Sequence, residues 1–160
     1  VKVETHDGIR RVGKYAFYNC KLLRRINLKS AVDIDYAAFY GCKNLTDVEV
    51  GENLETIEGS AFNSCTSLKH IMLSAVTYIG PYAFGKCRRL KDIELSERLE
   101  MIEPGAFGGC ARLQRIAIPL KRDLFEFDIP HEECTQFYRC EKLATVDLVG
   151  EVHKTVASLH

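Results

Sequence analysis

One arrangement of hydrophobic and polar positions recurs six times along the 160-residue chain. It consists of Phe, two residues, Cys, two residues, Leu, two residues, an aliphatic residue, one residue and a second aliphatic residue. The first copy is Phe17, Cys20, Leu23, Ile26 and Leu28. The other five copies begin at Phe39, Phe62, Phe84, Phe107 and Phe137, which makes the steps between Phe residues 22, 23, 22, 23 and 30 residues long. Because one such unit does not bury its own apolar face, the repetition predicts a solenoid of stacked units.

Each unit divides into two predicted elements. The Leu and the two aliphatic residues at the end of a copy alternate with polar residues, which predicts a short strand, and stacked strands form one parallel sheet. Before the Phe, an Ala and an earlier aliphatic residue have a spacing that suits a short helical or 3₁₀ turn. We therefore expect an α/β solenoid with a concave parallel sheet of about six short strands and helical or 3₁₀ turns on the convex side.

At the level of motifs, Ala-Phe-x-x-Cys-x-x-Leu-x-x-Ile-x-Leu over roughly residues 9–148 resembles the BspA-like, Treponema-type class of leucine-rich repeats. This resemblance implies a right-handed leucine-rich-repeat horseshoe that serves protein interaction. In some members of the class, the horseshoe acts as a cell-surface adhesin. It assigns no catalytic residues to this chain.

The repeats predict a single leucine-rich repeat domain over 1–160. Its parts are an N-terminal half-repeat (1–11), five regular repeats (12–118), an insertion (119–136), a degenerate sixth repeat (137–148) and a C-terminal cap (149–160). Within the insertion, Phe125, Phe127 and Ile129 alternate with acidic residues, which is compatible with a packed cap-like loop or with a partner-binding loop. The first residues read as half of a repeat strand, so we expect the chain to be a fragment of a longer protein.

The amino-acid composition limits the classes of partner that we expect for this chain. The chain has 22 basic and 22 acidic residues, so no global field favours nucleic acid or an anionic membrane. No apolar run approaches the ~20 residues of a membrane-spanning helix, which predicts no membrane insertion. A protein or a peptide is the expected partner.

Six of the seven cysteines occupy one repeat position, which predicts a structural ladder of reduced thiols rather than a disulfide framework. The ladder consists of Cys20, Cys42, Cys65, Cys87, Cys110 and Cys140. Reduced thiols slightly favour the cytoplasm, with the cell surface or secretion as the alternative. His131, Cys134 and Cys140 are three metal-ligand types within ten residues, but zinc prefers four ligands and Cys140 belongs to the ladder. We predict no metal site there; a Cys134–Cys140 disulfide is an alternative in an oxidising compartment.

No sequence motif indicates catalysis. The chain has neither a glycine-rich phosphate loop after a strand nor a Gly-x-Ser-x-Gly elbow. We therefore expect no enzymatic activity and no small-molecule cofactor.

The strand residues that point away from the core form the candidate partner-binding surface. Parity places Arg25, Asp47, His70, Asp92, Arg115 and Thr145 in one row across the strands, with neighbours about 5 Å apart. The next row is Asn27, Glu49, Met72, Glu94, Ala117 and Asp147. We select Arg25, Asn27, Asp47, Glu49, His70, Met72, Asp92, Glu94 and Arg115 as candidate site residues. They form either an acidic centre around His70 and Met72 or a row in which opposite charges neutralise one another and only keep the surface of the sheet hydrated.

Three functions compete at this point. The first is a non-catalytic protein–protein interaction module that presents its concave sheet, a rigid surface that is ordered before binding. The second is a cell-surface adhesin or glycan-binding extracellular repeat domain. The third is a structural spacer in a larger protein.

Overall fold

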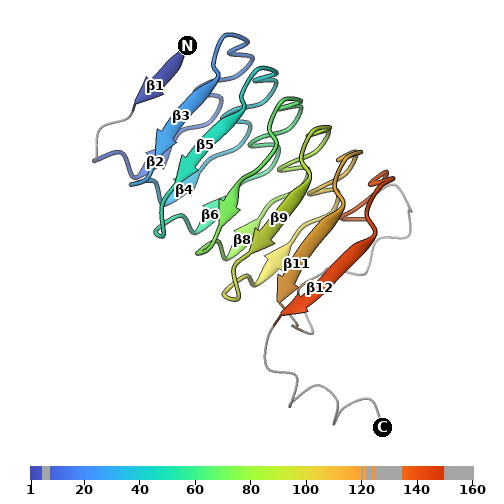
Figure 1. The fold of residues 1–160 in the computed structure, drawn as a ribbon. Coiled ribbons are helices and arrows are strands. Elements are labelled where there is room, and N and C mark those ends of the chain that lie inside the picture. The colour runs from blue at the N-terminus through green and yellow to red at the C-terminus, as the bar shows by residue number, and fades with distance from the viewer. Residues whose placement is uncertain (5–7, 120, 122–123, 125–134, 150–160) are drawn as a thin grey trace, which may run out of the picture.

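The computed structural model describes residues 1–4, 8–119, 121, 124 and 135–149. The repeats stack side by side as a parallel-strand solenoid, and each coil contributes one strand at the front and, in most coils, one strand of two residues behind it (Figure 1). The predicted boundaries of the insertion and of the C-terminal cap fall largely outside the described residues.

The front of the solenoid is formed by seven strands, which occupy the predicted strand positions and the N-terminal half-repeat. They are β1 (Lys2–Glu4), β3 (Arg25–Leu28), β5 (Asp47–Val50), β7 (Met72–Leu73), β9 (Asp92–Leu95), β11 (Arg115–Pro119) and β12 (Thr145–Val149). All pairings are parallel, in the orders β1-β3-β5 and β7-β9-β11-β12. The predicted continuous sheet is therefore two sheets, because no strand pairing joins β5 to β7 among the described residues.

A second parallel sheet lies behind the first and was not predicted. It has five strands of two residues each: β2 (Arg11–Val12), β4 (Asp33–Ile34), β6 (Thr56–Ile57), β8 (Tyr78–Ile79) and β10 (Met101–Ile102). These strands contain the aliphatic residue that precedes each Phe by five positions. Stacking of equal coils brings these residues side by side, so each pair of neighbours closes a short parallel ladder.

The described residues contain no helix, so the expected helical or 3₁₀ turns are not confirmed. The reason is a left-handed residue two positions before the Phe and another two positions after it, such as Tyr15 (φ 57°) and Asn19 (φ 53°). Residues with positive φ do not continue a right-handed helix. The backbone instead alternates two kinds of hydrogen bond: Tyr18 N–H donates to Tyr15 O within the coil, and Phe17 N–H donates to Ala38 O in the next coil.

The core between the two sheets is a stack of equivalent side chains. Phe39, Phe62, Phe84 and Phe107 are fully buried. Neighbouring Phe rings of the six repeats lie parallel, with centroids 5.1–5.7 Å apart. Each ladder thiol from the second repeat onward donates a hydrogen bond to the Phe carbonyl of the preceding repeat, at 3.0–3.2 Å. Cys thus suits the position because it is small and carries a weak donor for that carbonyl.

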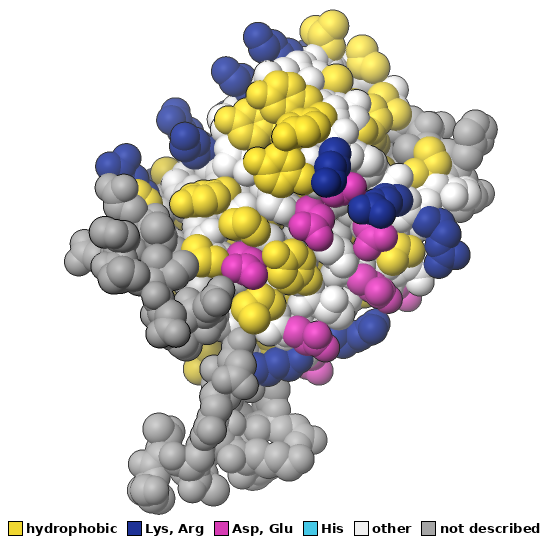
Figure 2. Space-filling model, turned by 180° about the vertical axis from the view of Figure 1, so that it is seen from behind, with side chains coloured by type: hydrophobic (Ala, Val, Ile, Leu, Met, Phe, Trp, Pro, Cys, Tyr) yellow, Lys and Arg dark blue, Asp and Glu magenta, His cyan; other side chains and the backbone are white. Residues whose placement is uncertain are grey.

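Among the described residues, the Phe and Cys side chains of each end repeat have an equivalent neighbour on one side only. Cys20 and Cys140 are half-buried, whereas the other four ladder cysteines are buried, so burial of the ladder is complete only in the interior. Phe17 and Phe137 are likewise half-buried. On the rear face, hydrophobic side chains gather toward the N-terminal end (Figure 2). Among them, Tyr15 meets Tyr18 and Tyr36 edge to face, with ring centroids 5.7 and 5.6 Å apart.

Candidate functional site

The candidate site is the front face, which we define as the outward surface of β1, β3, β5, β7, β9, β11 and β12. Outward residues of these strands lie in the two rows that parity predicts. In the first row Lys2 pairs with Arg25 and Arg25 with Asp47, and farther along Asp92 pairs with Arg115 and Arg115 with Thr145. In the second row Asn27 pairs with Glu49, while Met72, Glu94, Ala117 and Asp147 follow one another.

His70 interrupts the first row. Met72 pairs with Glu94, which places His70 two residues earlier, level with Asp92 but before the first residue of β7. No ladder connects His70 to Asp47 in the described structure, although both line the same hollow. The expected position of His70 between two aspartates is thus only partly reproduced, because β7 is two residues shorter than β5 and β9.

Ion pairs neutralise both ends of the front face. Arg25 Nε lies 3.1 Å from Asp47 Oδ2, and Lys29 Nζ lies 3.3 Å from Glu49 Oε2. Arg115 pairs with Asp147 of the second row and not with Asp92, its expected partner in the first row. The hydrogen bond to Asp147 and the charge of that carboxylate raise the pKa of the Arg115 guanidinium, with smaller contributions from Glu94 and Asp92.

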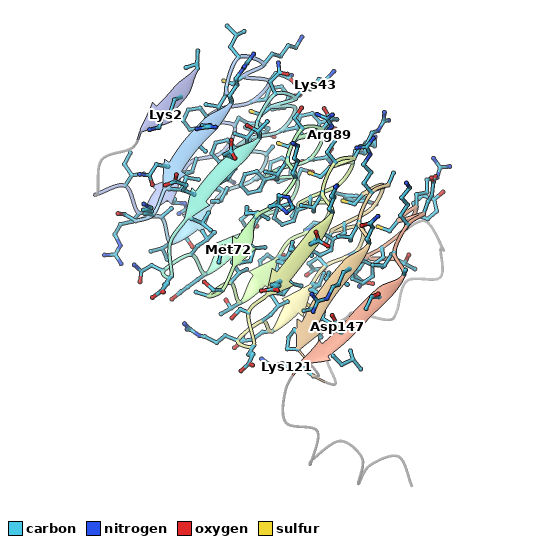
Figure 3. All side chains as sticks on the ribbon, in the orientation of Figure 1. Lys2, Lys43, Met72, Arg89, Lys121 and Asp147 are labelled. Carbon is cyan, nitrogen blue, oxygen red and sulfur yellow. The ribbon has the colours of Figure 1, made fainter. Side chains whose placement is uncertain are left out.

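The centre of the front face has acidic side chains without an ion pair. Neither Asp92 nor Glu94 forms an ion pair with any described residue. Both side chains are exposed, and the neighbouring Met72 is 74% exposed. Figure 3 shows Met72 on β7 between Lys2 on β1 and Asp147 on β12. The expected acidic centre is therefore narrower than predicted, because Asp47 and Glu49 already have cationic partners.

A hollow of about 670 Å³ lies over the N-terminal half of the front face. Its polar lining consists of Lys2, Arg25, Asn27, Lys29, Asp47, Glu49 and His70, and Met72 lies at its far side. Lys2 and Lys29 were not among the predicted site residues. The sequence nevertheless indicates both residues. Lys29 stands two residues after Asn27 and therefore has the same outward parity as Arg25 and Asn27, and Lys2 lies in the predicted half-repeat strand.

The thiols of the ladder from the second repeat onward have raised pKa values, which disfavour the reactive thiolate form. Burial raises the pKa of Cys42 and of Cys140 to about 11, and it raises the pKa of Cys65, Cys87 and Cys110 well above the ordinary value of a thiol. All ladder cysteines are free. His131 and Cys134 of the considered metal cluster lie outside the described residues, and the residues that are described contain no group of three metal-ligating side chains. Likewise, no helix of the described chain has the length and apolar character needed to span a bilayer.

Comparisons with known proteins agree with this architecture. The sequence matches the BspA type leucine rich repeat region in six copies, over residues 10–128 and 72–158. The crystal structure of a T. pallidum leucine-rich repeat protein is similar with a TM-score of 0.78 and 28% identity, covering 94% of this chain and 71% of that chain. A Bacteroides ovatus leucine-rich repeat protein has a TM-score of 0.60 and 21% identity, covering 92% of this chain and 45% of that chain.

The pneumococcal vaccine antigen PcpA has a TM-score of 0.66 and 20% identity, covering 94% of this chain and 42% of that chain. At such identities the likeness concerns the fold alone. No curated protein matches the sequence. The six matched copies extend over nearly the whole sequence, and the chain therefore belongs to the BspA type leucine-rich repeat family.

Proposed function

We propose that this chain is a non-catalytic protein–protein interaction module whose front face binds a protein or a peptide. The observation that carries the proposal is the exposed pair of Asp92 and Glu94, which forms no ion pair among the described residues and lies beside the exposed Met72. Carboxylates without an ion-pair contact attract a basic group, and a flexible thioether adapts to an apolar side chain.

The hollow next to this pair supports the same proposal. Its volume of about 670 Å³ admits several side chains of a partner, and its lining groups are fixed by the strand register. Surfaces built on strands are ordered before binding, so a partner does not have to organise them. We therefore expect a partner segment that places a basic residue on Asp92 and Glu94 and an uncharged residue in the hollow.

The experiment starts from a peptide display selection against the immobilised chain. Selected binders are then measured by fluorescence anisotropy against the double variant Asp92→Asn/Glu94→Gln. We expect enriched Lys or Arg in the binders and a loss of affinity of about tenfold for the variant, since each desolvated charge pair contributes on the order of 1 kcal/mol or more. A matched control is Glu97→Gln/Glu100→Gln, which removes two exposed carboxylates that do not belong to the front strands. Binders that ignore the first variant, or that respond equally to both, would contradict the proposal.

A further inference from the structure

A second surface follows the turns between each Phe and the next front strand. We call it the basic ridge and define it as the four residues that stand two to five positions after each Phe. It carries eight basic residues: Lys21, Lys43, Lys86, Arg88, Arg89, Arg112, Arg139 and Lys142. All eight are exposed, and Glu141 is the single acidic residue of the ridge. Because the whole chain has a formal charge of zero, positive charge is concentrated on this edge.

The figures place the ridge along one long edge of the solenoid. A line of Lys and Arg side chains follows the upper left edge of the rear view in Figure 2. In Figure 3, Lys43 of the second repeat and Arg89 of the fourth repeat extend at the same edge. The ridge is thus separate from the front face and its acidic centre.

Glycines open a hollow in the rear side of this edge. The residue directly after the Phe is Tyr in the first, second and sixth repeats, and the rings of Tyr18 and Tyr40 stack with centroids 5.1 Å apart. In the fourth and fifth repeats the same position is Gly85 and Gly108. The missing side chains leave a hollow of about 500 Å³ with Gly85, Gly108, Gly109 and Ala111 in its lining. Its volume is in the ordinary range of ligand pockets.

The walls of the hollow combine aromatic rings with cations. Tyr82 stands on one side and Tyr138 on the other, and the guanidinium of Arg139 lies 5.1 Å from the centroid of the Tyr138 ring. Lys86 and Arg88 complete the positive lining. Within the described chain, no ion pair neutralises Lys86, Arg88 or Arg139. An apolar floor is therefore surrounded by three cations that have no anionic partner there.

We propose that this hollow binds an acidic segment of a protein partner. An apolar side chain of the segment lies over Gly108, between the two tyrosines, and neighbouring carboxylates pair with Lys86, Arg88 and Arg139. Charge-assisted hydrogen bonds to Arg and Lys fix the carboxylates, and the remaining cations of the ridge accelerate the encounter. The site uses a different surface from the front face, so its outcome is independent of the proposed function.

The lining favours an acidic peptide over a sulfated or phosphorylated polymer. Such a polymer places an anionic group at regular intervals, whereas Glu141 interrupts the cations at the end of the hollow. A peptide can donate a backbone N–H to that carboxylate. The glycine floor and the tyrosine rings offer contact area to an apolar side chain, which a peptide has and a sulfated or phosphorylated polymer lacks.

Three variants test the site. Gly108→Tyr fills the hollow with the residue that this chain already carries at the equivalent position in three repeats, so we expect the fold to accept it. The double variant Lys86→Glu/Arg139→Glu reverses two exposed charges of the lining without entering the core. The matched control is Lys43→Glu, because Lys43 occupies in the second repeat the position of Arg88 in the fourth, outside the hollow. Thermal unfolding verifies that each variant remains folded.

The probe is a fluorescein-labelled peptide of eight residues in which Asp and Glu flank a central Phe, measured by anisotropy with the full chain. We expect Gly108→Tyr and the double charge variant each to weaken binding by about tenfold or more, and Lys43→Glu to change it by less than about twofold. Replacing the central Phe of the probe by Ser should weaken binding to the unmodified chain and have little effect on Gly108→Tyr.

Three results would overturn the proposal. One is the absence of binding up to millimolar concentrations of the chain. Another is a loss of affinity in Lys43→Glu as large as in the double charge variant together with no loss in Gly108→Tyr, which indicates diffuse attraction to the ridge. The last is a heparin fragment that binds more tightly than the peptide and is indifferent to Gly108→Tyr, because the ridge then serves a polyanion and the hollow has no role.

Discussion

The interior and the terminal repeats carry the same motif but do not bury it equally. Phe62, Phe84 and their ladder cysteines are fully buried, whereas Phe17 and Cys20 at one end and Phe137 and Cys140 at the other are half-buried. Each interior ring is covered by the rings of the coils before and after it, whereas Phe17 and Phe137 each stack on one described ring. In a solenoid, then, the energetic weight of a residue depends on its neighbours as much as on its own repeat.

The largest test of this comparison replaces the stacked rings. Phe62→Ala should lower the free energy of unfolding by about 3–5 kcal/mol, since it leaves a cavity between two neighbouring rings. Phe17→Ala removes the same atoms from a half-buried position and should cost clearly less, under about 2 kcal/mol. Urea unfolding followed by circular dichroism measures both. Equal losses would show that the terminal ring is covered as completely as the central one.

A glycine pair gives a smaller and cleaner test, because Gly13 and Gly80 occupy the same repeat position. A Cβ atom added at Gly80 would lie 2.6 Å from the backbone nitrogen of Gly59 in the preceding coil, while a Cβ at Gly13 meets nothing within 4 Å. Gly80→Ala should therefore cost about 1–3 kcal/mol, as overpacking does, and Gly13→Ala should change stability by less than about 0.5 kcal/mol. A neutral Gly80→Ala would mean that neighbouring coils separate easily.

The thiol ladder gives the mildest test, through its dependence on pH. Burial raises the folded-state pKa of Cys42 to about 11 from an ordinary value of 9.0, so the folded chain holds its proton more tightly than the unfolded chain. The stability that this group contributes is complete below about pH 9 and is lost as the pH rises from 9 toward 11. Cys65 and Cys87 add to this loss as the pH rises above 9, because burial raises the pKa of each well above its ordinary value.

Urea unfolding at pH 8, 9, 10 and 11 measures this decline. Lysine and tyrosine groups titrate in the same range, so the control is the double variant Cys65→Ala/Cys87→Ala, which should show a shallower decline than the unmodified chain. An identical slope for the two proteins would remove the thiols as its cause.

Much of the fold follows from the repeat itself. The positions of the front strands, the stacking of the Phe rings, the free thiols and the parity of the two outward rows were all predictable from alternation and period. Arg25 beside Asp47 is an example, since a fixed register brings them together and the structure places their charged atoms 3.1 Å apart. Such contacts are predictable because each depends only on the distance along the repeat.

The remaining features depended on contacts between coils. Irregular turns replace the expected helical turns because left-handed residues such as Tyr15 direct backbone N–H groups to the next coil, and no hydrophobic pattern marks that choice. The break beside His70 and the pairing of Arg115 with Asp147 are likewise local outcomes of packing. Along the sequence Arg115 has acidic neighbours in both adjacent coils, and only side-chain geometry selects one of them.

By itself the sequence determined the period, the core residues and the set of side chains on the front face. Each of these depends on the pattern within one repeat, and stacking only places the same pattern side by side. Only the tertiary structure decided which charges remain without partners and where the surface is hollow. Through the differences between neighbouring repeats, Asp92 and Glu94 form no ion pair with a described residue, and Gly85 and Gly108 open a cavity beside Tyr138. The residues that differ meet on one surface only because coils that are 22 or 23 residues apart in the chain lie side by side.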